Sequence, residues 1–176
     1  MKKDIYELSI NNIDESKIKE LVKIHNENFK NKVEGSYFKD ILENNLYTVY
    51  CTNCIIENTV RNIEENKITE KEEKISGYII YYDTFSCFDL FEIAVDKEFQ
   101  NRGIGNRLLV NSMSALFDNE KYENRTKEEK SILLEVNENN FSAIKLYRKN
   151  NFKEISVRKN YYGTGQNALI MIRSND

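Results

Sequence analysis

The sequence has little or none of several residue types that mark particular classes of protein. Its 176 residues include no proline, no tryptophan, one histidine, three cysteines and six glycines. Turns must therefore be built from Asn, Asp and Gly. A chain of this length buries roughly 70% of the surface that its unfolded form exposes, which is enough for a core without a disulfide framework.

Long hydrophobic runs are also missing. No stretch approaches the roughly 18 consecutive apolar residues that a membrane-spanning helix requires. The first seven residues carry charges of both signs before any apolar stretch begins, which is not the pattern of a signal peptide. We therefore expect no association with a membrane and a cytoplasmic location, where the cysteines stay reduced.

An excess of positive charge is missing as well. The chain has 26 Lys and Arg against 29 Asp and Glu, which gives a formal net charge of −3. A nucleic-acid groove needs a concentrated cationic surface, so we expect no direct binding to nucleic acid. The hydrophobic fraction of 40% and the charged fraction of 31% lie in the globular range. The length then predicts a single domain over residues 1–176.

The cysteines do not predict a metal site. Cys51 and Cys54 form a C-x-x-C pair, and Cys87 and His25 would complete a Cys3His set in number only. Cys87 stands alone, and His25 falls in a predicted helix far upstream. A redox pair would need a helix N-terminus after its first cysteine, whereas the residues after Cys54 continue a β-like run.

Hydrophobic periodicity predicts an order of strand, two helices, three strands, helix, strand, helix and two strands. A mixed sheet flanked by helices follows from that order, which places the chain in the α+β (mixed α/β) class. Asp14 is the expected N-cap of the first helix. The expected strands cover 5–10, 46–51, 75–82, 89–95, 131–136, 155–161 and 168–172, and the expected helices include 18–24, 36–44, 102–117 and 140–150.

A polar stretch interrupts this order. The segment from Glu57 to Lys74 is rich in Glu, Asn and Lys and has little to bury. We expect it to form either an extended hairpin connection or a mobile insertion. A second charged loop is expected over 118–130.

One segment combines a strand, a turn and a glycine-punctuated helix start. The strand Glu92-Ile93-Ala94-Val95 is followed by Gln100-Asn101-Arg102-Gly103-Ile104-Gly105. Glycines let a ligand approach the backbone, and free N–H groups at the positive end of a helix bind anions such as a pyrophosphate. The dinucleotide fingerprint and the P-loop are both excluded by the spacing. A tight turn without a ligand is the alternative explanation.

In this context, Gln100-x-x-Gly103-x-Gly105 resembles the Q/R-x-x-G-x-G/A signature of the GNAT acyltransferases. In that family the signature cradles the pyrophosphate of acetyl-CoA. The resemblance implies the GNAT fold, with a central mixed, largely antiparallel sheet of about seven strands flanked by about four helices, and it implies acetyl-CoA as co-substrate. The implied cofactor-binding residues are Ile93, Ala94, Val95, Gln100, Asn101, Arg102, Gly103, Ile104, Gly105, Asn106, Asn140 and Tyr147.

Later segments resemble the RimI type of GNAT, enzymes that acetylate the N-terminal alanine of a ribosomal protein. The resemblance implies direct acetyl transfer in a ternary complex to the N-terminal amine of a protein, and none of the cysteines occupies a motif position. Departures at 29–35, Gly163 and Asn167 fall on the acceptor side, so an acetyltransferase for small amines or lysine side chains and a non-catalytic CoA-binding module remain alternatives. The segments that carry this resemblance are 134–140, 143–147, 151–152, 158–162 and 168–171.

Catalytic roles follow from the same resemblance. An α-amino group has a reference pKa of about 7.7 to 8.0, so a modest general base suffices. Glu135 aligns with the base of the RimI type, and Glu92 is a rival because other GNATs place the base on that strand. Tyr147 matches the general acid that protonates the leaving thiolate. A surface carboxylate at Glu135 and a core tyrosine at Tyr147 are the ordinary structural explanations.

Further roles are implied on the two sides of the reaction centre. A backbone N–H near Val95 would stabilise the oxyanion. Asn140 can cap the last long helix and also bond the pantetheine. Tyr161 and Tyr162 would line the acceptor mouth, although a tyrosine pair in a strand also packs without any function.

Overall fold

The computed structural model describes residues 5–61 and 67–174. Its strands and helices follow the predicted order, and 3-10 helices at Lys97–Phe99 and Glu120–Tyr122 add to them. None of the described helices is both long and apolar enough to cross a membrane. The elements are β1 (Tyr6–Leu8), α1 (Glu15–Asn28), α2 (Gly35–Glu43), β2 (Tyr47–Arg61), β3 (Lys67–Asp83), β4 (Phe88–Val95), α3 (Ile104–Phe117), β5 (Ile132–Asn137), α4 (Phe141–Lys149), β6 (Lys153–Arg158) and β7 (Ala168–Arg173).

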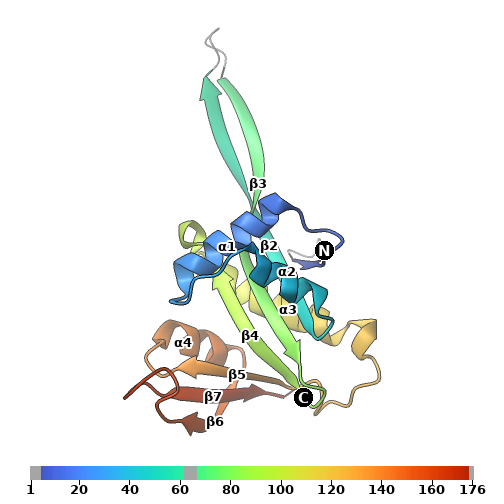
Figure 1. Cartoon of the computed structure of the whole chain (residues 1–176), viewed down its shortest axis with the longest axis vertical. Helices are drawn as coiled ribbons and strands as arrows, with labels where there is room; N and C mark the ends of the chain where they lie inside the picture. The colour runs from blue at the N-terminus through green and yellow to red at the C-terminus, as the bar shows by residue number, and fades with distance from the viewer. Residues whose placement is uncertain (1–4, 62–66, 175–176) are drawn as a thin grey trace.

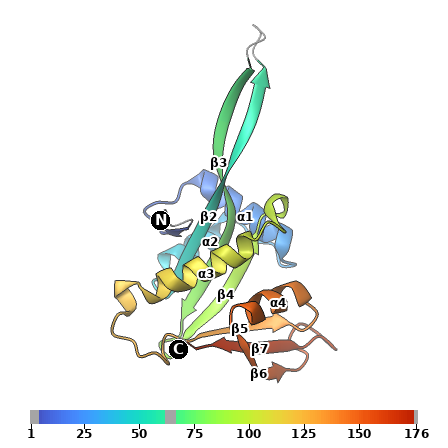
Figure 2. The ribbon, with the colours of Figure 1, turned by 180° about the vertical axis from the view of Figure 1, so that it is seen from behind.

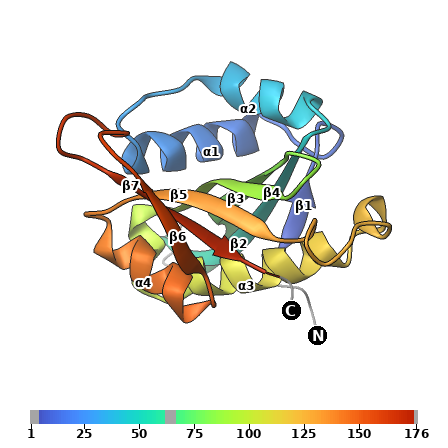
Figure 3. The same cartoon turned by 90° about the horizontal axis from the view of Figure 1, so that it is seen from below.

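The strands form one seven-stranded sheet in the order β1-β2-β3-β4-β5-β7-β6. The β4–β5 pair is parallel, and the other neighbouring strands are antiparallel. Helices α1 and α2 cover one face of the sheet, and α3 and α4 lie on the other (Figure 3). The expected mixed, largely antiparallel sheet with flanking helices is thus confirmed.

Local sequence signals explain where the helices begin. The carboxylate of Asp14 accepts a hydrogen bond of 2.9 Å from the Lys17 N–H, which caps α1 as predicted. The side chain of Asn140 caps α4 in the same way through the Ala143 N–H, at 3.2 Å. Each cap satisfies one of the N–H groups that a helix start leaves without an intrahelical partner.

The core lies on both sides of the sheet. One cluster packs α3 and α4 against the strands and includes Leu108, Leu109 and Ile132. The other packs α1 and α2 against the opposite face and includes Leu21 and Phe38. Side chains alternate along a strand, so each strand contributes to both clusters.

Two places in the sheet shape the space beside β4. Pairing between β4 and β5 covers only Phe88 with Ile132 and Asp89 with Leu133, and beyond these pairs the two strands diverge (Figure 1). Gly77 on β3 faces Val95 at the far end of β4, where a Cβ atom would lie 2.8 Å from the Ala94 carbonyl oxygen. That close approach explains the glycine.

The polar segment forms a long two-stranded ribbon. Strands β2 and β3 stay paired out to Arg61 and Lys67, and together they project beyond the rest of the sheet (Figures 1 and 2). The described part is therefore the extended hairpin, and the shorter strand bounds expected from the sequence are wrong. Residues 62–66 of the expected insertion lie outside the described residues.

Two other expectations about loops and strands are corrected. Strand β6 ends at Arg158, so Tyr161 and Tyr162 lie in the turn before β7 and not in a strand. The charged loop over 118–130 contains a 3-10 turn whose Tyr122 is buried against Phe88, with the ring centroids 4.7 Å apart. A single aromatic residue in a charged segment has no hydrophobic periodicity, so the sequence pattern did not predict this contact.

Candidate active site

A cavity of about 470 Å³ lies where β4 ends and where α3 and α4 begin. It contains eleven of the twelve residues predicted to bind a cofactor. Arg102 is the exception, because it is exposed and its guanidinium lies 5.5 Å from the centroid of the Phe99 ring. The predicted residues that line the cavity are Ile93, Ala94, Val95, Gln100, Asn101, Gly103, Ile104, Gly105, Asn106, Asn140 and Tyr147, and Asn28, Phe99, Ser142, Ala143 and Leu146 join them.

The turn from β4 into α3 gives the cavity its polar end. Asn101 and Gly103 both have positive φ angles, of 60° and 75°. Gly103 is the N-cap residue of α3 and offers no side chain to the first helical N–H groups, which therefore remain available to an anion. A Cβ atom at Gly103 would meet no atom within 4 Å, so the space above these N–H groups is open. This geometry fits a pyrophosphate.

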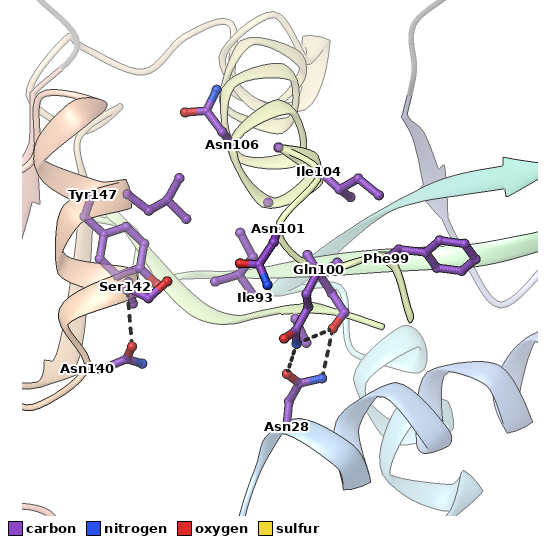
Figure 4. Close-up of a pocket in the computed structure, with 16 residues that line it drawn as sticks. Asn28, Ile93, Phe99, Gln100, Asn101, Ile104, Asn106, Asn140, Ser142 and Tyr147 are labelled. Carbon is purple, nitrogen blue, oxygen red and sulfur yellow. Dashed lines mark hydrogen bonds between the residues drawn. The ribbon is translucent and has the colours of Figure 1, made fainter. Parts of the chain in front are cut away.

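The end of α1 is tied directly to this turn. The Gln100 side-chain amide donates to Asn28 Oδ1 and to the Val95 carbonyl, each at 3.0 Å, and the Asn28 amide donates to the same carbonyl at 3.1 Å (Figure 4). Gln100 thus holds the turn in place. Asn28 was not predicted, although a polar residue seven positions after the buried Leu21 shares its helix face.

Tyr147 closes the cavity from the side of α4 (Figure 4). The residue is 5% exposed, and its ring packs against Phe152 with the centroids 5.6 Å apart. Burial raises the pKa of the Tyr147 phenol, so the hydroxyl keeps its proton. No hydrogen bond of this hydroxyl is found among the described residues, which leaves the proton available to a group in the cavity.

Glu135 lies on β5 and faces away from the α3 and α4 core, because its neighbours Leu134 and Val136 are buried in that core. Arg158 donates a hydrogen bond of 3.1 Å to Glu135 Oε1. A hydrogen bond from Tyr161 to Glu135 raises the pKa of that phenol, and the Tyr162 hydroxyl lies 3.4 Å from the Glu135 carbonyl oxygen.

The predicted acceptor tyrosines therefore do gather around Glu135. Their rings meet edge to face, with the centroids 4.9 Å apart, and both side chains are exposed. Asp89 adds a second carboxylate nearby. Burial and then the charge of Glu135 raise the pKa of Asp89, and its Oδ1 atom is buried without a hydrogen-bond partner among the described residues. An amine would enter an acidic, tyrosine-lined region.

Glu92, the rival base, has different surroundings. Its side chain is 12% exposed and lies between β4 and the two helices of the opposite face. Tyr37 donates to Glu92 Oε1 at 2.6 Å, Tyr78 donates to Oε2 at 2.9 Å, and His25 Nδ1 lies 3.3 Å from Oε2. The structure does not place Glu92 and Glu135 in one hydrogen-bond network within the described residues.

The cysteines lie away from the cavity. Cys51 is buried in β2, where burial raises the pKa of its thiol. Cys54 and Cys87 are half-buried, and all three are free thiols. None of them lines the cavity, so a cysteine nucleophile has no position from which to attack a group bound there.

Comparisons with known proteins agree with this geometry. The family model described as an acetyltransferase (GNAT) domain matches residues 63–154. The chain is 38% identical over 82 residues to an N-alpha-acetyltransferase of Sulfolobus acidocaldarius, and this alignment covers 47% of this chain and 45% of the relative. It is 34% identical over 103 residues to a ribosomal protein bS18-alanine N-acetyltransferase of Salmonella typhimurium. This second alignment covers 57% of this chain and 64% of the relative.

These matches are partial in length. The chain spans about half to two thirds of the length of these two curated relatives. The fold match is longer: the crystal structure of the ribosomal-protein-S18-alanine N-acetyltransferase from Escherichia coli superposes with a TM-score of 0.68 at 21% identity. That superposition covers 98% of this chain and 94% of the other.

Proposed function

The chain belongs to the GNAT acetyltransferase family, and on that basis we propose that it transfers the acetyl group of acetyl-CoA to the N-terminal α-amino group of a protein. The reaction is a direct transfer in a ternary complex. The proposed substrate class is that of the RimI type, and the relatives named bS18-alanine N-acetyltransferase support it. A ribosomal protein is the corresponding acceptor.

The observation that carries the proposal is the pairing of an anion site with a proton donor in one cavity. The helix start at Gly103 would hold the pyrophosphate of acetyl-CoA. The cavity between the end of β4 and the residues of α4 would admit the pantetheine, which Asn140 can bond. Tyr147 would then face the sulfur and protonate the thiolate as it leaves.

The acceptor enters from the opposite face, where Glu135 lies. Glu135 accepts hydrogen bonds from Arg158 and Tyr161, which are both exposed, whereas Glu92 is enclosed by two tyrosines and a histidine. We therefore assign the general base to Glu135. The reference pKa of an α-ammonium group is about 7.7 to 8.0, so part of the acceptor is already unprotonated near neutral pH and a modest general base suffices. The backbone N–H at Val95 would stabilise the oxyanion.

The test is a panel of acceptors incubated with acetyl-CoA. The panel contains peptides that differ in their first residue, the same peptides with a blocked N-terminus and an internal lysine, and a small polyamine. Mass spectrometry then locates the acetyl group. We expect acetylation of the free α-amino group, with the rate depending on the first residue.

Acetylation of the blocked peptides or the polyamine in place of the free N-terminus would support a lysine or small-amine acetyltransferase. Binding of acetyl-CoA without transfer to any acceptor would support a non-catalytic CoA-binding module. Both outcomes would reject the proposed acceptor class.

A further inference from the structure

The one histidine of the chain lies in a buried polar cluster beside the active site. His25 is in the last turn of α1 and is 3% exposed. Its ring packs against Phe29, Tyr37 and Phe38, with centroid distances of 4.7, 5.2 and 6.2 Å. Neither the predicted catalytic residues nor the cavity lining includes it.

Both ring nitrogens of His25 face oxygen atoms. Nε2 lies 3.1 Å from the carbonyl oxygen of Asn31, in the connection between α1 and α2. Nδ1 lies 3.2 Å from the Tyr78 hydroxyl and 3.3 Å from Glu92 Oε2. The imidazole therefore bridges the α1–α2 connection and strand β4.

Counting protons shows which form of the ring fits these contacts. The Tyr78 hydroxyl has one proton, and Glu92 Oε2 is the nearer acceptor for it, at 2.9 Å against 3.2 Å for Nδ1. A proton on Nδ1 gives both oxygen atoms a donor, whereas an unprotonated Nδ1 would compete with Glu92 for the Tyr78 proton. Nε2 faces a carbonyl oxygen, which can only accept, so it carries a proton too.

The tyrosines keep their protons in this cluster. Burial raises the pKa of Tyr78, and burial together with the hydrogen bond to Glu92 raises the pKa of Tyr37. Both phenols therefore remain donors to the Glu92 carboxylate through the alkaline range. Within the described residues, Glu92 accepts from both tyrosines and faces the His25 ring, and a buried charge requires such partners.

We propose that His25, as an imidazolium paired with Glu92, is a positioning residue that holds the end of α1 and the following connection for the acceptor. It acts together with Asn28, one helical turn further on, which bonds the Val95 carbonyl. The end of α1 is thus anchored to β4 at Glu92 and again at Val95. The connection that begins there lies at the same end of the sheet as the turn between β6 and β7, which carries Tyr161 and Tyr162 (Figures 1 and 3).

This inference rests on the proposed function, because it assigns the anchored connection to acceptor binding. It also gives Glu92 a role other than general base. A carboxylate has about four lone-pair sites, and the contacts with two phenols and the imidazole occupy three of those of Glu92. The groups that face His25 are Glu92 from β4, Tyr78 from β3, Tyr37 from α2 and the Asn31 carbonyl.

The first experiment observes His25 directly. Because the chain has one histidine, a long-range ¹H–¹⁵N correlation spectrum of the uniformly ¹⁵N-labelled protein reports this ring without assignment. We expect both ring nitrogens to show the shifts of protonated nitrogens at pH 7, in the absence of any substrate. One nitrogen with the shift of an unprotonated ring nitrogen would overturn the ion pair, whatever acceptor the enzyme uses.

The second experiment separates positioning from catalysis by kinetics on the best peptide of the panel. We expect His25→Gln and Glu92→Gln to raise the KM for the peptide about tenfold, with kcat and the KM for acetyl-CoA changed by less than about twofold. A loss of kcat in Glu92→Gln that alkaline pH restores would identify Glu92 as the base. An unchanged peptide KM in both variants would reject the positioning role.

A double variant keeps the test valid if one single variant folds poorly. Removing one partner leaves the other charge buried, whereas His25→Gln with Glu92→Gln removes both charges and keeps side chains that can hydrogen bond. The double variant should show the same peptide KM as the single variants, because the two residues act as one unit. Additive increases would show that they act separately. Lys39→Gln, which breaks an exposed ion pair with Glu15 on the same two helices, is the matched control and should leave all constants unchanged.

Discussion

Glu135 and Glu92 are both glutamates on neighbouring central strands, and their surroundings set them apart. Glu92 lies in a closed cluster of donors, while Glu135 has an exposed arginine and the side chains of Tyr161 and Tyr162 around it. Both residues were candidates from the sequence. A strand pattern shows that a carboxylate alternates with core residues, but it does not show which side chains pack over that carboxylate.

Replacing Glu135 by Gln tests the base assignment. The change keeps size and hydrogen bonding but removes the group that accepts the acceptor's proton, so kcat should fall by about 10²-fold at neutral pH. Raising the pH above about 8 should restore part of the activity, because more of the acceptor amine is then already unprotonated. A pH series of kcat/KM for wild type and variant is the measurement. Wild-type rates in the variant would remove Glu135 from the mechanism.

Replacing Tyr147 by Phe tests the proton donor. The ring and its contact with Phe152 are kept, so the fold and the affinity for acetyl-CoA should be retained while kcat falls. Since burial raises the pKa of this phenol, the wild-type hydroxyl stays protonated above pH 10, and its ionisation should cause no loss of kcat below that pH. Single-turnover rates with saturating acetyl-CoA measure the effect. An unchanged rate in the variant would assign the proton to another donor.

The residues that the sequence did not reveal share one property. His25 and Asn28 lie on a helix that is distant in sequence from the β4–turn–α3 segment, so no local motif includes them. Their signal in the sequence was weak: His25 is a polar residue among the buried positions of α1, and the exposed Asn28 follows it by one helical turn on the same side of the helix. The motif residues, by contrast, lie within one β4–turn–α3 segment, and a local pattern was sufficient to predict most of the cavity lining.

At the scale of elements, the turn before α3 makes a prediction about acetyl-CoA. Gly103→Asp places a carboxylate at the helix start that would bind the pyrophosphate, so like charges would repel. Acetyl-CoA raises the melting temperature of a protein that binds it in the native state, and this rise should be largely lost in the variant. Thermal unfolding with and without acetyl-CoA measures it.

The matched control for that variant is Gly165→Asp. Gly165 has a similar φ angle of 73° and equally open surroundings, but it lies in the turn between β6 and β7 and does not line the cavity. Both variants bear the same backbone strain, so each lowers the starting melting temperature. The control should keep the full response to acetyl-CoA. Equal losses in the two variants would show that strain, and not the anion site, is responsible.

The β2–β3 ribbon gives a second prediction at this scale. Glu57 and Lys71 are cross-strand partners, so replacing residues 58–70 by Asn-Gly closes the hairpin in register. We expect the shortened protein to fold and to keep its response to acetyl-CoA, because none of the removed residues that the structure describes lines the cavity. A folded variant that has lost the thermal response would show that the ribbon shapes the cofactor site.

The order of elements was predictable, and the length of two strands was not. Each helix and each inner strand has an apolar face with the period of its structure, which fixed the order along the chain. The outer parts of β2 and β3 project beyond the rest of the sheet (Figures 1 and 2), and their sequence carries no regular hydrophobic alternation. Cross-strand backbone pairing extends them, and that pairing has no sequence signature of its own.

At the scale of the whole molecule, β4 joins two halves. Strands β1 to β3 with α1 and α2 lie on one side, and β5 to β7 with α4 lie on the other. The halves meet through a short parallel pairing at the start of β4 and β5, and the cavity lies between the end of β4 and the residues of α4. Contacts beside that short pairing should therefore matter for the stability of the fold more than for the affinity of the cavity.

Arg125 makes such contacts. Its guanidinium donates to the Asp83 carboxylate at the end of β3 and to the Glu129 carbonyl, and it lies 4.6 Å from the centroid of the Phe88 ring at the start of β4. The side chains of Arg125 and Asp83 are 13% and 8% exposed. Arg148 with Glu154 is a comparison pair at the surface, with exposures of 62% and 38%.

Arg125→Met keeps much of the apolar contact with the ring and leaves the Asp83 carboxylate buried without its partner. Breaking a buried pair from one side costs about 3–5 kcal/mol, which for a domain of this size lowers the melting temperature by about 6–20 °C. Arg148→Met should cost at most about 1 kcal/mol, because exposed pairs contribute little. Adding Asp83→Asn to Arg125→Met should recover part of the loss, since the unpaired buried charge is then removed.

Thermal unfolding with and without acetyl-CoA measures all three variants, and the rise in melting temperature due to acetyl-CoA should equal that of wild type in each. Equal losses for Arg125→Met and Arg148→Met would refute the role of the buried pair, and a lost acetyl-CoA increment in Arg125→Met would show that stability and cofactor binding are not separate in this fold.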